Sequence, residues 1–117
     1  MYTIGVDLGA TFVKMGIVDS KGRVYFRRKI ETPPGAKKSI LIDAIIYNIR
    51  DINKESGKKI RGVGIGVPGP VDSKKGIVHY FPNIKGWKEV PLKAILQKKL
   101  SMRVELDNDV NAMTLGE

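Results

Sequence analysis

Alternating apolar and polar residues fill the first thirty positions of the chain. Apolar side chains recur at every second position of residues 2–7, and a second run rich in β-branched residues covers 12–18. Turn-forming residues then lead into a third run of this kind at 23–30. The pattern predicts an antiparallel meander of strands, which ends at the Pro-Pro-Gly break at residues 33–35.

A helix is predicted after this break. Isoleucines recur at steps of three and four along residues 42–52, so they lie on one face of a helix. Ser39 is suited to cap the start of this helix, and Ser56-Gly57 to end it. We therefore expect the isoleucine face to pack in the core.

Strands and helices alternate in the second half of the chain. Residues 60–67 are typical of a buried strand, and glycine at every second position leaves one of its faces without side chains. We expect a short edge strand at 77–80, a helix that starts near Pro91, a strand at 104–106 and a further helix from about Asp109. The predicted order is βββαβ(β)αβα, an α/β fold.

Charge and composition narrow the function classes. The 117-residue chain has a formal net charge of +9 and no cysteine, which excludes disulfides and thiol nucleophiles within it. Its lysines form scattered pairs, typical of a solvated surface, although the net charge would also attract phosphate-bearing partners. No apolar run approaches a membrane-spanning length and no export signal is recognisable, so we expect a cytoplasmic protein.

A polar turn separates the first two predicted strands. Gly9 can turn the chain with positive φ and expose backbone N–H groups, Thr11 adds a hydroxyl, and Lys14 adds a positive charge. Asp7 offers a carboxylate of the kind that binds Mg²⁺ or its waters. Taken alone, this stretch is compatible with a phosphate-binding turn or with a plain hairpin.

Two later stretches are also candidates for chemistry. Residues 64–69 match the dinucleotide pattern G-x-G-x-x-G, but Pro68 and Pro70 exclude the helix that this pattern requires. We interpret residues 67–72 as a rigid turn that either borders a ligand or merely leaves the sheet. Residues 107–111 place two carboxylates and two amides at a strand-to-helix junction, as a site or as a helix cap.

Taken in order, these stretches resemble the ROK family of sugar kinases. The family motifs D-x-G-G-T, G-x-P-G-x-x-D, P-N-x-x-G-W and E-N-D-x-N-A correspond to residues 7–11, 66–72, 82–87 and 107–112. The resemblance covers the whole chain and implies a mixed-sheet, actin-like ATPase domain related to ribonuclease H. Residues 1–117 would form the N-terminal lobe of a two-lobed kinase, and the C-terminal lobe with its adenosine pocket and structural zinc site would lie outside this chain.

The resemblance also implies roles for individual residues in phosphorylation of a hexose hydroxyl by ATP. Asp109 matches the catalytic base that accepts the proton of the sugar hydroxyl. The expected sugar-binding residues are Gly69, Asn83, Asn108 and Asp109. The expected residues for ATP phosphates are Asp7, Gly9, Thr11 and Lys14, with Asp7 also the expected Mg²⁺ partner.

The chain departs from the family pattern at two positions, and three side chains near the motifs receive plain interpretations. Ala10 replaces the second glycine of the first motif, and Asp107 replaces a common glutamate. Phe81 and Trp87 flank the Asn83 loop and are expected to pin it to the core rather than to stack on a sugar. His79 is expected at an ordinary surface or strand position.

Two alternative functions remain open. Some ROK members are sugar-responsive transcriptional regulators, but those carry a helix-turn-helix before the phosphate turn, whereas this chain begins its first strand at Tyr2. A ribonuclease H-like nuclease would suit the net charge and would use Asp7 with Asp107 or Asp109 around two metal ions, but it leaves residues 82–87 unexplained. We therefore expect ATP and a sugar as partners, no nucleic acid or membrane, a homo-oligomeric intact protein, and little activity from this piece alone.

Overall fold

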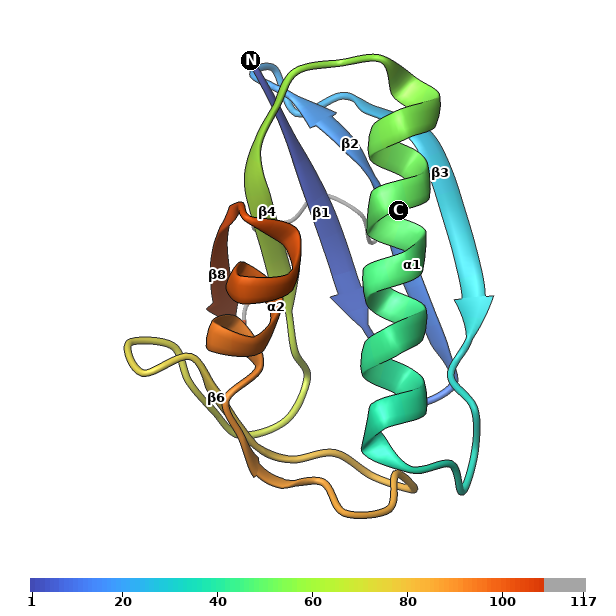
Figure 1. The fold of residues 1–117 in the computed structure, drawn as a ribbon, viewed down its shortest axis with the longest axis vertical. Helices are drawn as coiled ribbons and strands as arrows, with labels where there is room; N and C mark the ends of the chain where they lie inside the picture. Colours follow the sequence, from blue (N-terminus) through green and yellow to red (C-terminus); the bar gives the residue numbers. More distant parts are fainter. Residues whose placement is uncertain (109–117) are drawn as a thin grey trace.

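The computed structural model describes residues 1–108, which form a mixed five-stranded sheet, a small three-stranded sheet and two helices (Figure 1). The elements in chain order are β1 (Tyr2–Leu8), β2 (Phe12–Asp19), β3 (Val24–Glu31), α1 (Lys38–Ser56), β4 (Ile60–Gly66), β5 (Val71–Asp72), β6 (Ile77–Tyr80), β7 (Lys88–Val90), α2 (Leu92–Leu100) and β8 (Arg103–Asp107). The helix expected from Asp109 lies outside the described residues.

The large sheet has the strand order β3-β2-β1-β4-β8. Strands β1, β2 and β3 pair antiparallel, which confirms the predicted meander. Strand β4 pairs parallel with β1 on one side and with β8 on the other. The carboxyl ends of β1, β4 and β8 therefore meet at one edge of the sheet.

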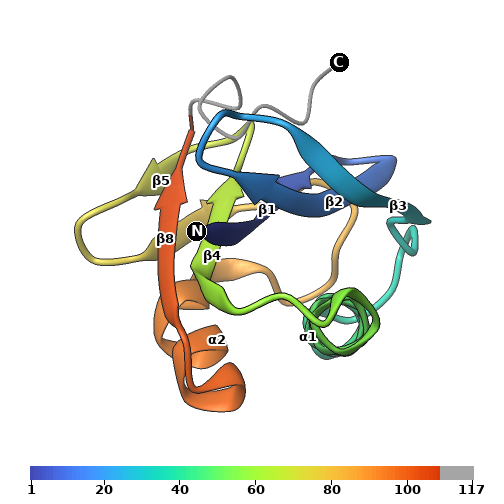
Figure 2. The ribbon, with the colours of Figure 1, turned by 90° about the horizontal axis from the view of Figure 1, so that it is seen from above.

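Both helices cover the same face of this sheet (Figure 2). The α1 stripe is buried as predicted; its buried residues are Leu41, Ile42, Ile45, Ile46, Ile49 and Ile52. It packs with the side chains of Ile4, Val6 and Ile65, which are fully buried. Because successive residues of a strand point to opposite faces, the glycines of β4 lie on the face that neither helix covers.

The start of α1 differs from the prediction. The helix begins at Lys38 after Lys37, with no side-chain cap, so the expectation that Ser39 caps it is wrong. The backbone N–H of Lys38 instead donates to the carbonyl of Lys85, 2.9 Å away, so a distant loop takes the place of a capping side chain. Gly57 ends the helix in the left-handed conformation, as predicted.

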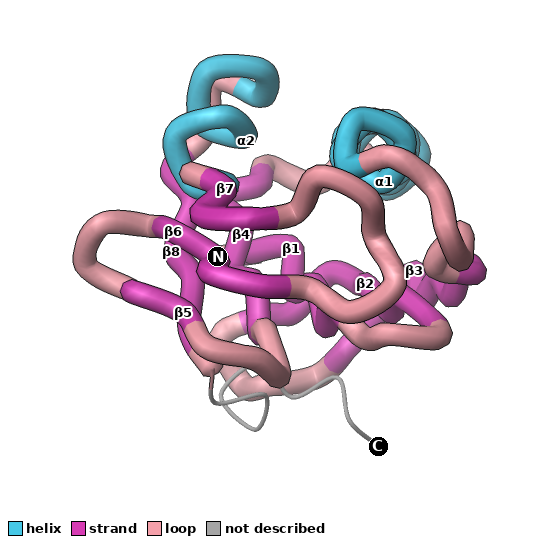
Figure 3. The backbone as a smooth tube through the Cα atoms, turned by 90° about the horizontal axis from the view of Figure 1, so that it is seen from below, coloured by secondary structure: helices cyan, strands magenta, loops and turns pink. Residues whose placement is uncertain are grey.

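The small sheet has the order β5-β6-β7 and lies at the end of the molecule where α1 begins (Figures 1 and 3). Residues 77–80 form its central strand, so the expectation of an edge strand there is wrong. The rings of Phe81 and Trp87 pack 5.4 Å apart in the core, which confirms that they anchor the intervening loop. Within residues 1–108, neither helix has the length and apolar character needed to cross a membrane.

The turn between β2 and β3 is organised by one carboxylate. Asp19 accepts hydrogen bonds from the backbone N–H groups of Lys21 and Arg23, both at 2.9 Å, and from the Tyr25 hydroxyl at 2.8 Å. Partial burial raises the pKa of Asp19, but these hydrogen bonds and the Arg23 charge outweigh it and lower the pKa from 3.8 to about 2. The turn is therefore stabilised by the ionised form.

We predict that Asp19→Asn removes part of the acid sensitivity of the fold. The folded-state pKa lies below the unfolded one, so ionised Asp19 contributes stability above about pH 4, and this contribution is lost as the pH falls toward 2. Urea unfolding above about pH 4 and again near pH 2 gives the free energy of unfolding under each condition. The difference between these two free energies should be smaller for the variant than for the wild type. Asp43→Asn, at an exposed position of α1, should keep the wild-type difference. Equal differences in all three proteins would contradict the assignment.

Candidate functional site

A row of polar residues crosses the large sheet at the edge where β1, β4 and β8 end. Backbone pairing places Asp7 opposite Lys14 on one side and Gly66 on the other. Gly66 lies opposite Asp107, and Lys29 continues the row beyond Lys14. Paired residues point to the same face of a sheet, so the row projects on the side opposite the helices.

The spacing within the row determines how its carboxylates can share an ion. Neighbouring strands are about 4.8 Å apart, so the Cα atoms of Asp7 and Asp107 are about 10 Å apart across Gly66. At this separation the two carboxylates can share one ion either by leaning toward each other or through its bound waters. Within residues 1–108 there is no group of three or more His, Cys, Asp or Glu side chains that could hold a metal. An ion that keeps several waters, as Mg²⁺ does, is compatible with this row.

The predicted phosphate turn connects β1 to β2 beside this row. The N–H of Gly9 donates to the carbonyl of Phe12 at 3.0 Å, which closes the turn. Gly9 is not in the left-handed region, so the expectation of a positive φ is wrong. Glycine is needed for a steric reason instead, because a Cβ there would lie 2.6 Å from the Phe12 carbonyl oxygen.

The other residues of this turn are accessible. Thr11 and Ala10 are exposed, and Lys14 is half-buried. Ala10 also lies outside the left-handed region, so the turn adopts its shape without the second glycine of the family motif. The methyl group of Ala10 is therefore compatible with the turn.

Thr32 anchors the turn between β1 and β2 by hydrogen bonds, and the sequence alone did not predict this role. It is the one buried polar residue within the described part of the chain, with 3% exposure. Its hydroxyl donates to the carbonyl of Gly9 at 2.7 Å, and its N–H donates to the carbonyl of Thr11 at 2.8 Å. Its partners lie more than twenty residues away along the chain, so no local pattern signals this role.

The turn after β4 ties the large sheet to the small one. The N–H of Val67 donates to the carbonyl of Asp107 at 2.8 Å, and the N–H of His79 donates to the carbonyl of Pro70 at 3.0 Å. Gly69 lies close to the second sheet, since a Cβ there would approach the Tyr80 carbonyl to 3.4 Å. The rigid turn predicted for residues 67–72 is thus fastened at both ends.

The loop that carries Asn83 connects β6 and β7 of the small sheet and lies between the aromatic anchors Phe81 and Trp87. Asn83 is exposed and adopts a left-handed backbone conformation with φ of 61°, which asparagine tolerates better than most residues. Its carbonyl accepts a hydrogen bond from the N–H of Gly35 at 2.8 Å. The loop is therefore held by the segment that precedes α1.

The last predicted site residues follow β8. Asn108 is exposed and comes directly after Asp107, at the sheet edge that carries the polar row. Asp109, the expected base, lies outside the described residues. The structure thus brings Asp7, Lys14 and Asn108 to one edge.

His79 takes no part in this edge. Its Nδ1 lies 2.8 Å from Oε1 of Glu89 on the neighbouring strand of the small sheet. The plain interpretation of this residue is in keeping with that contact.

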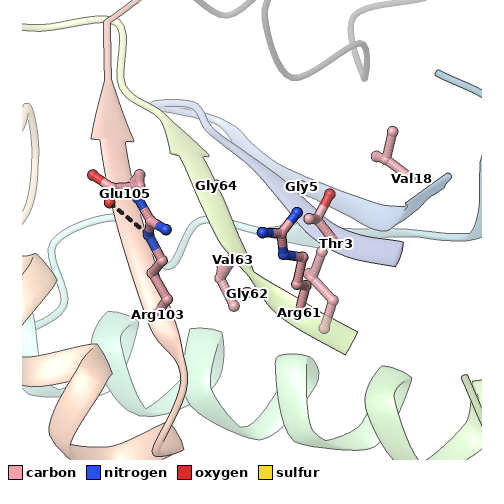
Figure 4. A pocket seen from close by; sticks show the side chains of 10 residues that line it. Thr3, Gly5, Val18, Arg61, Gly62, Val63, Gly64, Arg103 and Glu105 are labelled. Atoms are coloured by element: carbon pink, nitrogen blue, oxygen red, sulfur yellow. Dashed lines mark hydrogen bonds and ion pairs between the residues drawn. The ribbon is translucent and has the colours of Figure 1, made fainter. Parts of the chain in front are cut away.

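A separate depression of about 290 Å³ opens on the same face of the large sheet, nearer the amino ends of β1 and β4 (Figure 4). Its floor includes Gly5 and Gly64, which pair directly and present no side chains. On one side lies the ion pair of Arg103 and Glu105 at 3.1 Å; the hydrogen bond from Arg103 lowers the pKa of Glu105, against the effect of its slight burial. None of the predicted site residues that fall within residues 1–108 lines this depression.

Comparison with known proteins places these features in a family. The ROK family profile matches residues 3–117. The glucokinase of Thermotoga maritima is 38% identical over 97% of this chain and 35% of its own length. The xylose repressor of Caldicellulosiruptor bescii is 36% identical over 97% of this chain and 29% of its own length. The chain therefore spans about a third of the curated relatives that it matches.

A solved structure of a ROK protein has the same fold as this chain. The ROK glucokinase from Streptomyces griseus, in complex with glucose and AMPPNP, aligns with a TM-score of 0.83 at 37% identity, over 96% of this chain and 34% of that one. The expected actin-like ATPase fold, represented here by one lobe, is confirmed.

We predict that Gly9 and Ala10 respond differently to exchange of a single methyl group. Gly9→Ala forces the Phe12 carbonyl to move, so the free energy of unfolding should fall by about 1–3 kcal/mol. Ala10→Gly, its neighbouring control, adds only backbone freedom to the unfolded chain and should cost about 1 kcal/mol or less. Urea unfolding measures both values. A Gly9→Ala protein as stable as the wild type would show that the turn is not sterically closed.

Proposed function

Because the chain belongs to the ROK family, we propose that the complete protein transfers the γ-phosphate of ATP to a hydroxyl group of a hexose. The observation that carries this proposal is the convergence of the phosphate turn, the polar row and Asn108 at one edge of the sheet. The described residues would supply one wall of the site, and the remainder of the complete protein would supply the other.

The ATP phosphates are assigned to the turn between β1 and β2. Lys14 and the Thr11 hydroxyl would neutralise and hold them, and backbone N–H groups of the turn would donate to phosphate oxygens. Asp7 would hold Mg²⁺ through its waters, in keeping with its distance from Asp107 across Gly66. The ion would neutralise charge on the transferred phosphate.

The sugar is assigned to the other side of the same edge. Asn83 and Asn108 would hold sugar hydroxyls with their amides, and Gly69 would leave room beside them. Asp109 would accept the proton of the attacking hydroxyl while that oxygen bonds to the γ-phosphorus and ADP leaves with the electrons of the broken bond. An aspartate is ionised at neutral pH without any special shift of its pKa.

A sugar-responsive regulator is the second candidate, because the xylose repressor shares this part of the fold at 36% identity. Such a protein would use the same sugar-binding edge to report sugar concentration. Sugar binding alone cannot separate the two functions, whereas phosphate transfer can.

We predict that Asp109→Asn lowers kcat for glucose phosphorylation by about 10²- to 10⁴-fold, because the amide cannot accept the hydroxyl proton. The measurement is glucose-dependent ADP release from MgATP by the complete gene product. Asp43→Asn removes a carboxylate from the exposed side of α1 and should leave the rate unchanged.

Each other outcome identifies a different function. A complete protein that binds glucose but releases no ADP would favour the regulator. Cleavage of branched DNA with Mg²⁺, without hexose phosphorylation, would overturn the kinase proposal in favour of a nuclease.

A further inference from the structure

We infer that the segment from the end of β3 to the first residue of α1, residues 32–38, positions the phosphate turn and the Asn83 loop relative to each other. We call this segment the connector. Thr32 is its positioning residue for the phosphate turn, and Gly35 is its positioning residue for the Asn83 loop. The inference rests on the proposed function and deepens it by naming two residues that position its site. Neither residue belongs to the motifs that indicate the family.

At the first end of the connector, Thr32 holds the phosphate turn by two hydrogen bonds. Its hydroxyl and its N–H bind the carbonyls of Gly9 and Thr11 at 2.7 and 2.8 Å. In a trans peptide, the C=O and the following N–H point in opposite directions. Holding the Gly9 carbonyl toward the buried Thr32 therefore directs the N–H of Ala10 away from Thr32, where a phosphate oxygen could accept from it.

At the other end, three backbone hydrogen bonds join the connector to the Asn83 loop. The N–H of Gly35 donates to the carbonyl of Asn83, and the N–H of Lys85 donates to the carbonyl of Ala36, both at 2.8 Å. The N–H of Lys38 then donates to the carbonyl of Lys85 at 2.9 Å. Donors and acceptors alternate between the two segments as in a pair of parallel strands, so the loop and the connector move together.

The stretch between the two anchors is short and stiff. Thr32 and Gly35 are separated only by Pro33 and Pro34, whose rings fix φ near −65°. Three residue steps span at most about 11 Å. Gly35 then takes a φ of 73°, which sets the course of the chain from its own N–H, the donor to Asn83, to the Ala36 carbonyl, the acceptor from Lys85. The connector is therefore a rigid spacer between the proposed ATP and sugar sides of the site.

The first test separates the two ligands at Thr32. Thr32→Val keeps the shape of the side chain but leaves the Gly9 carbonyl without its hydroxyl donor, so the Kd for AMPPNP should rise about tenfold while the Kd for glucose stays close to that of the wild type. Thr32→Ser restores the hydroxyl and should restore AMPPNP binding. Thr3→Val, at an exposed position of β1, is the control. Calorimetry on the complete gene product measures both constants without turnover.

The second test, at Gly35, should change the Kd for glucose and leave the Kd for AMPPNP nearly unchanged. A Cβ there meets no atom within 4 Å, so Gly35→Ala acts through the backbone alone, by disfavouring the left-handed conformation. The Kd for glucose should rise roughly fivefold, with little change for AMPPNP. Gly57→Ala places the same change at a φ of 64° after α1, away from the loop, and should alter neither constant.

The outcomes distinguish this inference from the proposed function. If Thr32→Val and Gly35→Ala leave both constants unchanged, or raise both equally, or if Thr32→Ser fails to rescue, the positioning roles are wrong. If the wild type binds both ligands and the variants change the two Kd values as expected, but the wild type releases no ADP, the kinase proposal fails and the positioning roles stand. A wild type that binds neither ligand overturns both.

Discussion

Parallel pairing of β4 with β1 on one side and β8 on the other is the constraint on which the structure depends. Parallel neighbours cannot be joined by a tight turn, so the chain must cross over between them, and α1 and α2 lie in these crossovers. Right-handed crossovers that advance in the same direction along a sheet place both helices on one face. The opposite face keeps its polar row at the edge where the three carboxyl ends meet.

In the polar row, positive and negative side chains lie on different strands. Lys14 and Lys29 lie on β2 and β3, whereas Asp7 and Asp107 lie on β1 and β8, with Gly66 between the two carboxylates. The lysines on β2 and β3 would attract the proposed phosphate chain, and the carboxylates on β1 and β8 would attract the proposed hydrated cation. The local arrangement of charges therefore says more about ligands than the net charge of the whole chain, which is spread over scattered surface lysines.

Periodic features were predictable from the sequence, whereas features that depend on distant backbone groups were not. Alternation identified β1, β2 and β3, and the isoleucine spacing identified the buried face of α1, because both signals repeat over many residues. Ser39 failed as a cap because the carbonyl of Lys85 takes that role from a remote loop. The small sheet was incompletely predicted because its strands have only two to four residues and depend on pairing. Motifs located Asp7 and Asn83, but Thr32 acts on backbone carbonyls that no side-chain pattern reveals.

The two positions after Leu8 show that, of two neighbouring glycines in a motif, one can be required for a steric reason and the other not required. Gly9 has no space for a methyl group, whereas Ala10 is exposed with an ordinary backbone conformation. A side chain at the first position would therefore displace the Phe12 carbonyl, whereas the second position carries alanine within the same turn. A search pattern that demands both glycines would discard chains of this kind, and one that allows a small residue at the second position would retain them.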